Sequence, residues 1–93
     1  MKTIHNENKK RFDLFDDTGA RLGEIEYMYG GNNTLYATHT EVFPGGEGKG
    51  YATRLLDALV EYAVGREAKI VPVCAFVKGS FERNPEKYAA VIT

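Results

Sequence analysis

The chain has 93 residues and a formal net charge of −1 at pH 7, with 43% hydrophobic and 27% charged residues. This composition is typical of a globular domain, and the small net charge gives no electrostatic support for nonspecific binding to nucleic acid or to a membrane surface. No apolar run approaches the roughly 20 residues of a membrane span, and the N-terminus lacks the apolar core of a signal peptide. The single cysteine excludes an internal disulfide framework and a cysteine-rich zinc site. We therefore expect one cytoplasmic domain over residues 1–93 that holds no metal.

The first half of the chain predicts an antiparallel meander of strands. Three segments alternate apolar and polar side chains or are rich in β-branched and aromatic ones: residues 12–16, 21–29 and 34–43. The turn-forming stretches 17–19 and 30–33 separate them. Residues 1–10 are polar, and we interpret them as a frayed start from which Ile4 can pair with the first hairpin.

The second half predicts a crossover from one strand to a parallel one through a helix. Apolar residues recur at helical spacing over residues 53–64, and Gly65 marks the expected end of the helix. Residues 68–77 are almost all apolar and predict a buried strand, which must carry a bulge or an unpaired position at Pro72. A short helix is expected over residues 78–84. The chain therefore predicts an α/β fold with a mixed sheet, one long helix and one short helix.

A glycine-rich stretch, residues 43–52, lies between the meander and the long helix. A glycine-rich turn that leads into a helix N-terminus favours an anion, because bare amides and the positive end of the helix dipole point the same way. A Walker-type phosphate loop needs Ser or Thr after Gly48-Lys49, where Gly50 stands. A Rossmann fingerprint needs the loop after the first strand and an acidic residue at the end of the next strand. Neither requirement is met, because this loop follows the meander and the next strand ends without an acidic residue. A tight turn that binds nothing is the alternative.

The sequence Glu47-Gly48-Lys49-Gly50-Tyr51-Ala52 resembles motif A of the GNAT acetyltransferase superfamily, which is written Q/R-x-x-G-x-G/A. Gly50 and Ala52 match its last two fixed positions, whereas Glu47 departs from the usual Gln or Arg. Three flanking segments, residues 39–42, 71–77 and 83–88, also resemble the small stand-alone GNAT-like proteins. With them, the resemblance covers roughly residues 10–92. The resemblance implies a minimal GNAT fold, in which an antiparallel meander is followed by a βαβ crossover with splayed parallel strands.

The resemblance also implies an acetyl-CoA site. In that superfamily the loop amides hold the pyrophosphate of acetyl-CoA, and pantetheine forms hydrogen bonds along the edge of the third strand. The cofactor-binding residues carried over are Val42, Phe43, Glu47, Gly48, Lys49, Gly50, Tyr51, Ala52, Thr53 and Asn84. Lys49 is equally well interpreted as a solvated loop lysine, and Asn84 as a helix-end asparagine before proline.

Three residues are candidates for the chemistry of acetyl transfer. Cys74 is either a small buried hydrophobe or an acyl-accepting nucleophile at the splayed end of the last strand. His39 and Glu41 share one face of a strand, with Thr40 on the other, and both are candidate bases. They can assist direct attack by an amine, or pair with Cys74 if that face meets it.

We therefore predict an acetyl-CoA-dependent N-acyltransferase that transfers acetyl to an amine, either directly or through Cys74. The alternative is a CoA- or acyl-CoA-binding module without turnover. The short N-terminal half lacks the helices that wall the acceptor site in larger GNAT proteins, which implies an open groove for a small-molecule or protein amine. No nucleic-acid or membrane partner is expected, and the protein is expected to be a monomer or a weak dimer.

Overall fold

The computed structural model describes all 93 residues. Five strands form one sheet in the order β1-β2-β3-β4-β5. The strands are β1 (Lys2–Asn6), β2 (Arg11–Phe15), β3 (Arg21–Gly30), β4 (Thr34–Val42) and β5 (Lys69–Pro72), and the helices are α1 (Tyr51–Gly65) and α2 (Ala75–Arg83). Pairing is antiparallel from β1 to β4 and parallel between β4 and β5, so the sheet is mixed, as the sequence predicts.

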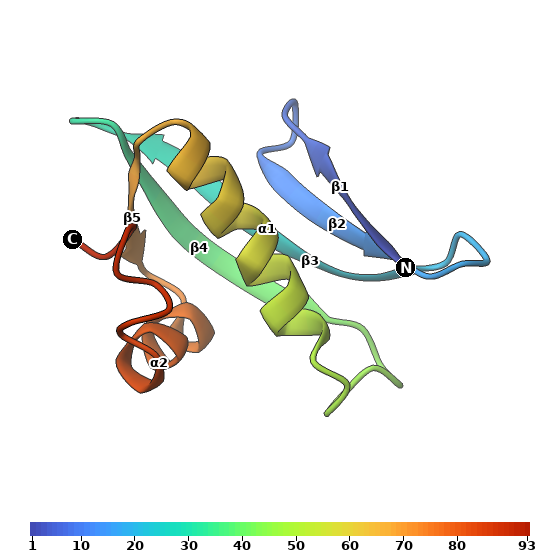
Figure 1. The fold of residues 1–93 in the computed structure, drawn as a ribbon. Coiled ribbons are helices and arrows are strands. Elements are labelled where there is room, and N and C mark those ends of the chain that lie inside the picture. The colour runs from blue at the N-terminus through green and yellow to red at the C-terminus, as the bar shows by residue number, and fades with distance from the viewer.

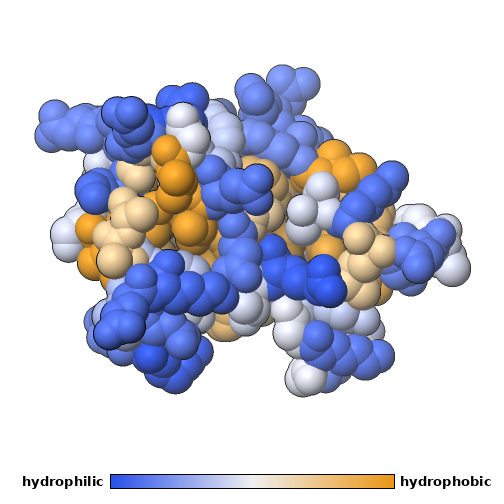
Figure 2. Space-filling model, viewed as in Figure 1, coloured by the Kyte–Doolittle hydropathy of each residue, from blue (hydrophilic) through white to orange (hydrophobic).

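The long helix α1 crosses one face of the sheet, and α2 lies beside the end of β5 (Figure 1). The apolar side chains of α1 fall on one face because they recur at helical spacing. Buried residues of this layer come from the sheet and from α1: Leu14, Ile25, Tyr27, Leu35, Ala37, Leu55, Leu56, Leu59 and Ala63. Seen from the side of α1, hydrophilic side chains surround several separate hydrophobic patches (Figure 2). No helix has the length and apolar character needed to span a membrane.

The beginning of the chain forms a regular strand rather than the predicted frayed start. Strand β1 pairs with β2 over its whole length, and Ile4 lies opposite Asp13. β1 lies at the edge of the sheet, and most of its side chains are exposed. Its sequence is therefore polar and lacks the apolar pattern that predicts a strand. The meander therefore has four strands instead of three.

Strand β5 ends at Pro72 instead of continuing to residue 77. Proline has no N–H to donate to a strand ladder, so the pairing stops there. The N–H groups of Val73 and Cys74 then both donate to the carbonyl oxygen of Ala37, at 3.1 and 2.9 Å. Helix α2 follows at once and begins at Ala75, before the predicted start at residue 78.

His5 anchors the edge strand β1 to the core. Its ring stacks on Phe12 with centroids 4.1 Å apart and meets the ring of Tyr62 edge-on at 4.5 Å. Its Nε2 atom lies 2.5 Å from the hydroxyl oxygen of Tyr27, which is buried. Burial lowers the pKa of His5 from its usual value, and the negative charge of Glu7 offsets this only in part.

We expect the protein to lose stability as the pH falls through about 6.5, the pKa of histidine in an unfolded chain. Just below this pH, His5 is protonated in the unfolded chain but still neutral in the folded protein. Unfolding is therefore increasingly favoured until the pH reaches the lower pKa that His5 has in the folded protein. Urea denaturation at several pH values across this window measures the loss. In a His5→Phe variant, which keeps an aromatic ring but does not titrate, the loss should be smaller. Equal losses in both proteins would contradict this role of His5.

Candidate functional site

The loop between β4 and α1 presents a run of backbone N–H groups without acceptors in the protein. The N–H of Gly46 donates to the carbonyl oxygen of Phe43, and the N–H of Arg54 donates to that of Gly50, both at 3.1 Å. Between these two bonds, the N–H groups of residues 47–53 donate to no backbone or side-chain acceptor. They lie at the N-terminus of α1, where the helix dipole favours negative charge. The loop can therefore hold an anion such as a pyrophosphate group.

Two glycines explain the shape of this loop. Gly50 precedes α1 with a φ of 78°, in the left-handed region that favours glycine. Gly46 is buried, and a Cβ there would lie 2.8 Å from Cγ1 of Val42 and 2.9 Å from Cδ2 of Tyr51. The loop therefore turns sharply and rests directly on the end of β4 and the start of α1.

Strands β4 and β5 separate beside this loop. β5 pairs with β4 only over residues 34–37, whereas β4 continues to Val42. The N–H of Phe43 donates to the carbonyl oxygen of Leu22 on β3, at 2.9 Å. Because alternate residues of a strand direct their backbone groups to opposite neighbours, those of Thr40 and Val42 face the gap on the β5 side. An extended ligand can pair with this free edge as an added strand would.

Val42 and Phe43, the two residues predicted to bind pantetheine, therefore differ in whether their backbone groups are free. The backbone groups of Val42 face the gap, which fits the expected contact with pantetheine. The prediction for Phe43 is not supported, because its N–H is bonded to Leu22 and its carbonyl oxygen accepts the N–H of Gly46. The backbone groups of Thr40, which the sequence analysis did not propose for this role, face the gap in the same way as those of Val42.

Cys74 lies where β4 and β5 separate, as the residue before α2 rather than inside a strand as predicted. Its thiol donates a hydrogen bond to Oγ1 of Thr40 across a sulfur–oxygen distance of 3.5 Å. Burial by itself raises the pKa of this thiol. Once deprotonated, the sulfur accepts hydrogen bonds from the Thr40 hydroxyl and from the backbone N–H groups of Val77 and Phe76, and these lower the pKa overall. A lowered pKa increases the thiolate fraction, which is the reactive form of cysteine.

His39 and Glu41 share a face of β4, as predicted, and His39 Nε2 lies 3.4 Å from Glu41 Oε1. The conditional pairing of His39 with Cys74 is wrong, because the side of β4 that faces Cys74 carries Thr40. A bulge places Thr38 between the pairs that Ala37 and His39 make with β3, and it fixes which side chains point each way. Bases and thiol therefore lie on opposite sides of β4.

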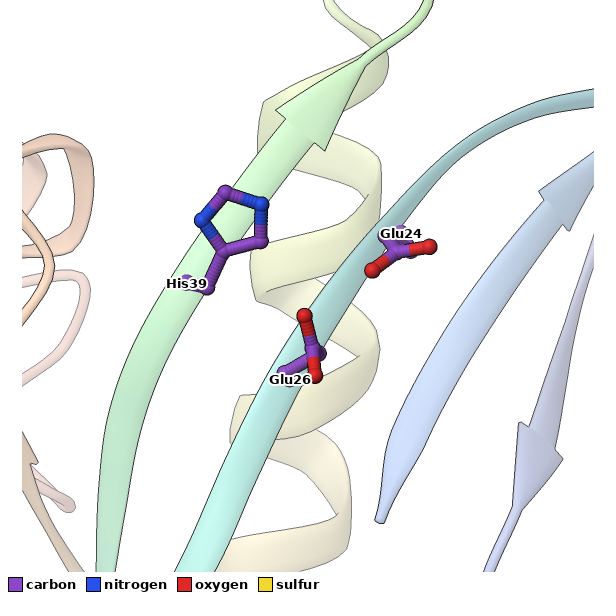
Figure 3. Close-up of side chains that lie close together, drawn as sticks. All are labelled: Glu24, Glu26 and His39. Atoms are coloured by element: carbon purple, nitrogen blue, oxygen red, sulfur yellow. The ribbon is translucent and has the colours of Figure 1, made fainter. Parts of the chain in front are cut away.

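The bases on β4 have two acidic neighbours that the sequence analysis did not single out. Glu24 pairs directly with Glu41, and Glu26 with His39, across β3 and β4. Figure 3 shows Glu24, Glu26 and His39 together, with α1 behind the sheet. Their donor atoms all lie within 4.8 Å of one another. Burial, followed by the hydrogen bond and charge of Glu24, raises the pKa of Glu26.

This mixed set of carboxylates and imidazole has the chemistry to bind a cation. Glu24 and Glu26 are two residues apart, so a strand over residues 21–29 puts them on one face, and this signal was present in the sequence. Only the register between β3 and β4 could show that this face meets His39.

Asn84 and Lys49 differ in their surroundings. The N–H and the side-chain Nδ2 of Asn84 both donate to the carbonyl oxygen of Ser80, at 3.0 and 3.2 Å, so this residue caps the end of α2. This favours the helix-end interpretation, and a contact of Asn84 with a cofactor stays a prediction. Lys49 is exposed and makes no ion pair in the protein, which leaves its charge available to a ligand.

The comparisons with known proteins agree with this geometry. The GCN5-related N-acetyl-transferase family matches residues 11–91. This chain belongs to the GCN5-related N-acetyltransferase (GNAT) family. A GCN5-like candidate N-acetyltransferase from Staphylococcus aureus is 32% identical, with a TM-score of 0.74 over 99% of this GNAT chain and 87% of that one. Both the predicted family and the predicted fold are thus confirmed.

Two longer proteins show the same fold. Nourseothricin acetyltransferase is 25% identical with a TM-score of 0.64, and the match covers 88% of this GNAT chain and 52% of that one. A candidate acetyltransferase from Pyrococcus furiosus is 26% identical with a TM-score of 0.60, over 78% of this chain and 56% of that one. This GNAT protein therefore spans about half the length of these two. Together with the family match, they support its assignment as an acyltransferase enzyme.

A Thr40→Val variant should raise the pKa of Cys74, because valine keeps the shape of threonine but removes the hydroxyl that stabilises the thiolate. The rate of thiol alkylation by iodoacetamide, measured against pH, reports this pKa. We expect the midpoint of the profile to move to higher pH. Thr38→Val is the matched control, since its hydroxyl donates to the carbonyl oxygen of Glu26 instead. An unchanged midpoint in Thr40→Val would exclude this contact as a cause of the lowered pKa.

Proposed function

We propose that residues 1–93 act as one minimal acetyltransferase domain that binds acetyl-CoA and transfers its acetyl group to an amine. The observation that carries the proposal is the run of free N–H groups at residues 47–53, which lies next to the unpaired edge of β4. The run suits a pyrophosphate group, and the strand edge suits the amides of pantetheine. An anion site beside a free strand edge matches the pyrophosphate group of coenzyme A and the pantetheine arm attached to it.

The cofactor supplies a thioester, whose carbonyl carbon is open to attack by a nucleophile. In the route through Cys74, the thiolate sulfur forms a bond to that carbon, and the bond from carbon to the sulfur of coenzyme A breaks. The acceptor amine then attacks the acetyl group on Cys74, loses a proton and frees the thiol. The position of Cys74 where the strands separate, with a lowered pKa, supports this route.

In the direct route the amine itself attacks the thioester. Glu41 or His39 removes the amine proton, either in contact with it or through a water molecule. These side chains lie on the side of β4 away from the thiol, so they do not assist Cys74. The two routes therefore use separate residues, and substitutions can separate them.

Binding of the cofactor can be tested by NMR titration with acetyl-CoA. We expect the amide resonances of Glu47, Gly48, Gly50 and Ala52 to shift, because their N–H groups have no partner in the protein. The amide of Gly31, which lies in the turn between β3 and β4, serves as the control and should not shift. Unchanged loop resonances at millimolar acetyl-CoA would reject the cofactor assignment.

The route can be tested by incubation with acetyl-CoA followed by intact-mass measurement. If Cys74 carries the acetyl group, the wild-type protein should gain one acetyl group and Cys74→Ala should gain none. Under the direct route, at least one of the variants Glu41→Gln and His39→Asn should lose amine transfer while Cys74→Ala keeps it. A protein that binds acetyl-CoA but transfers its acetyl group to no amine would instead be a non-catalytic CoA-binding module.

A further inference from the structure

Glu47 places an unpaired carboxylate in the loop that presents the free N–H groups. Its Oε2 atom accepts a hydrogen bond from the N–H of Gly45 at 3.0 Å. No lysine, arginine or histidine forms an ion pair with it. The backbone N–H of Glu47 begins the free run, so a negative charge lies beside donors that suit an anion.

The residue before Glu47 is packed tightly, which positions the backbone next to this carboxylate. The neighbouring residue Gly46 is buried against Val42 and Tyr51, and its N–H donates to the carbonyl oxygen of Phe43. Glu47 follows this buried glycine directly, and its side chain accepts the N–H of Gly45. Although both residues are exposed, this bond keeps the charge close to the backbone of the loop.

We propose that Glu47 limits the affinity of this loop for the pyrophosphate group of coenzyme A, an inference that rests on the proposed function. The carboxylate repels a second anion that binds to the N–H groups of the same loop. At a water-exposed site, one charge a few ångströms from a doubly charged anion changes affinity by about three- to tenfold. Glu47 thereby favours weak binding and rapid release of coenzyme A after acetyl transfer.

A Glu47→Gln variant isolates the charge from the hydrogen bond. Glutamine has nearly the same shape and keeps an oxygen that can accept the N–H of Gly45, so the loop retains its conformation. Glu61→Gln is the matched control, because Glu61 is exposed on α1 more than two helical turns from the loop. Both variants change the net charge equally, so general electrostatic effects cancel between them.

Calorimetric titration with coenzyme A, at low and at high salt, tests the inference. We expect Glu47→Gln to bind about three- to tenfold more tightly than wild type at low salt, and Glu61→Gln to bind like wild type. The gain should shrink at high salt, because ions screen the exposed charge.

Three results would overturn the role of Glu47. If wild type and Glu47→Gln both bind coenzyme A with equal affinity, or the variant binds more weakly, the role is wrong and the proposed function stands. A gain that does not change with salt excludes charge as its cause. If neither protein binds coenzyme A, the proposed function fails and the role of Glu47 falls with it.

Discussion

The carbonyl oxygen of Ala37 makes the last backbone hydrogen bonds that hold β4 against the segment after β5. It accepts the N–H groups of Val73 and Cys74, and beyond it the two strands have no further pairing. Pro72 lies directly opposite Ala37 in the register and cannot extend the ladder, since it has no N–H. The open edge of β4, the position of Cys74 and the start of α2 all follow from this one point of separation.

Strand β4 serves two separate surfaces. On the side of α1, Thr40 contacts Cys74 near the gap. On the other side, His39 and Glu41 lie among the carboxylates of β3. The bulge at Thr38 sets this division, because an extra residue in one strand reverses the side to which every later side chain points. A single strand thus presents a thiol contact on one side and candidate bases on the other.

The sequence was sufficient for the features that depend on local patterns. The helical spacing of Leu55, Leu59 and Ala63 predicted α1, and the glycines predicted the loop that precedes it. The end of β5 was missed because the residues after Pro72 continue an apolar run that suits either a strand or the first turn of a buried helix. Only packing against the rest of the protein decides between these two.

The contacts within the site were harder to predict, because they depend on register. No local pattern shows that Thr40 meets Cys74, or that Glu26 lies opposite His39, since each pair joins segments brought together only by the folded sheet and its bulge. The strand β1 was missed for a different reason. An edge strand with exposed side chains does not need the alternation of apolar and polar residues by which strands are recognised.

The free N–H groups of residues 47–53 belong to the main chain, which every amino acid except proline supplies alike. Exchanges of the exposed side chains at Lys49 or Thr53 leave those donors in place. Gly46 does not have this freedom, because its neighbours leave no room for a side chain. Relatives of this protein can therefore differ widely in the sequence of this loop and still bind an anion there. They need only keep Gly46 and the backbone conformation of the loop.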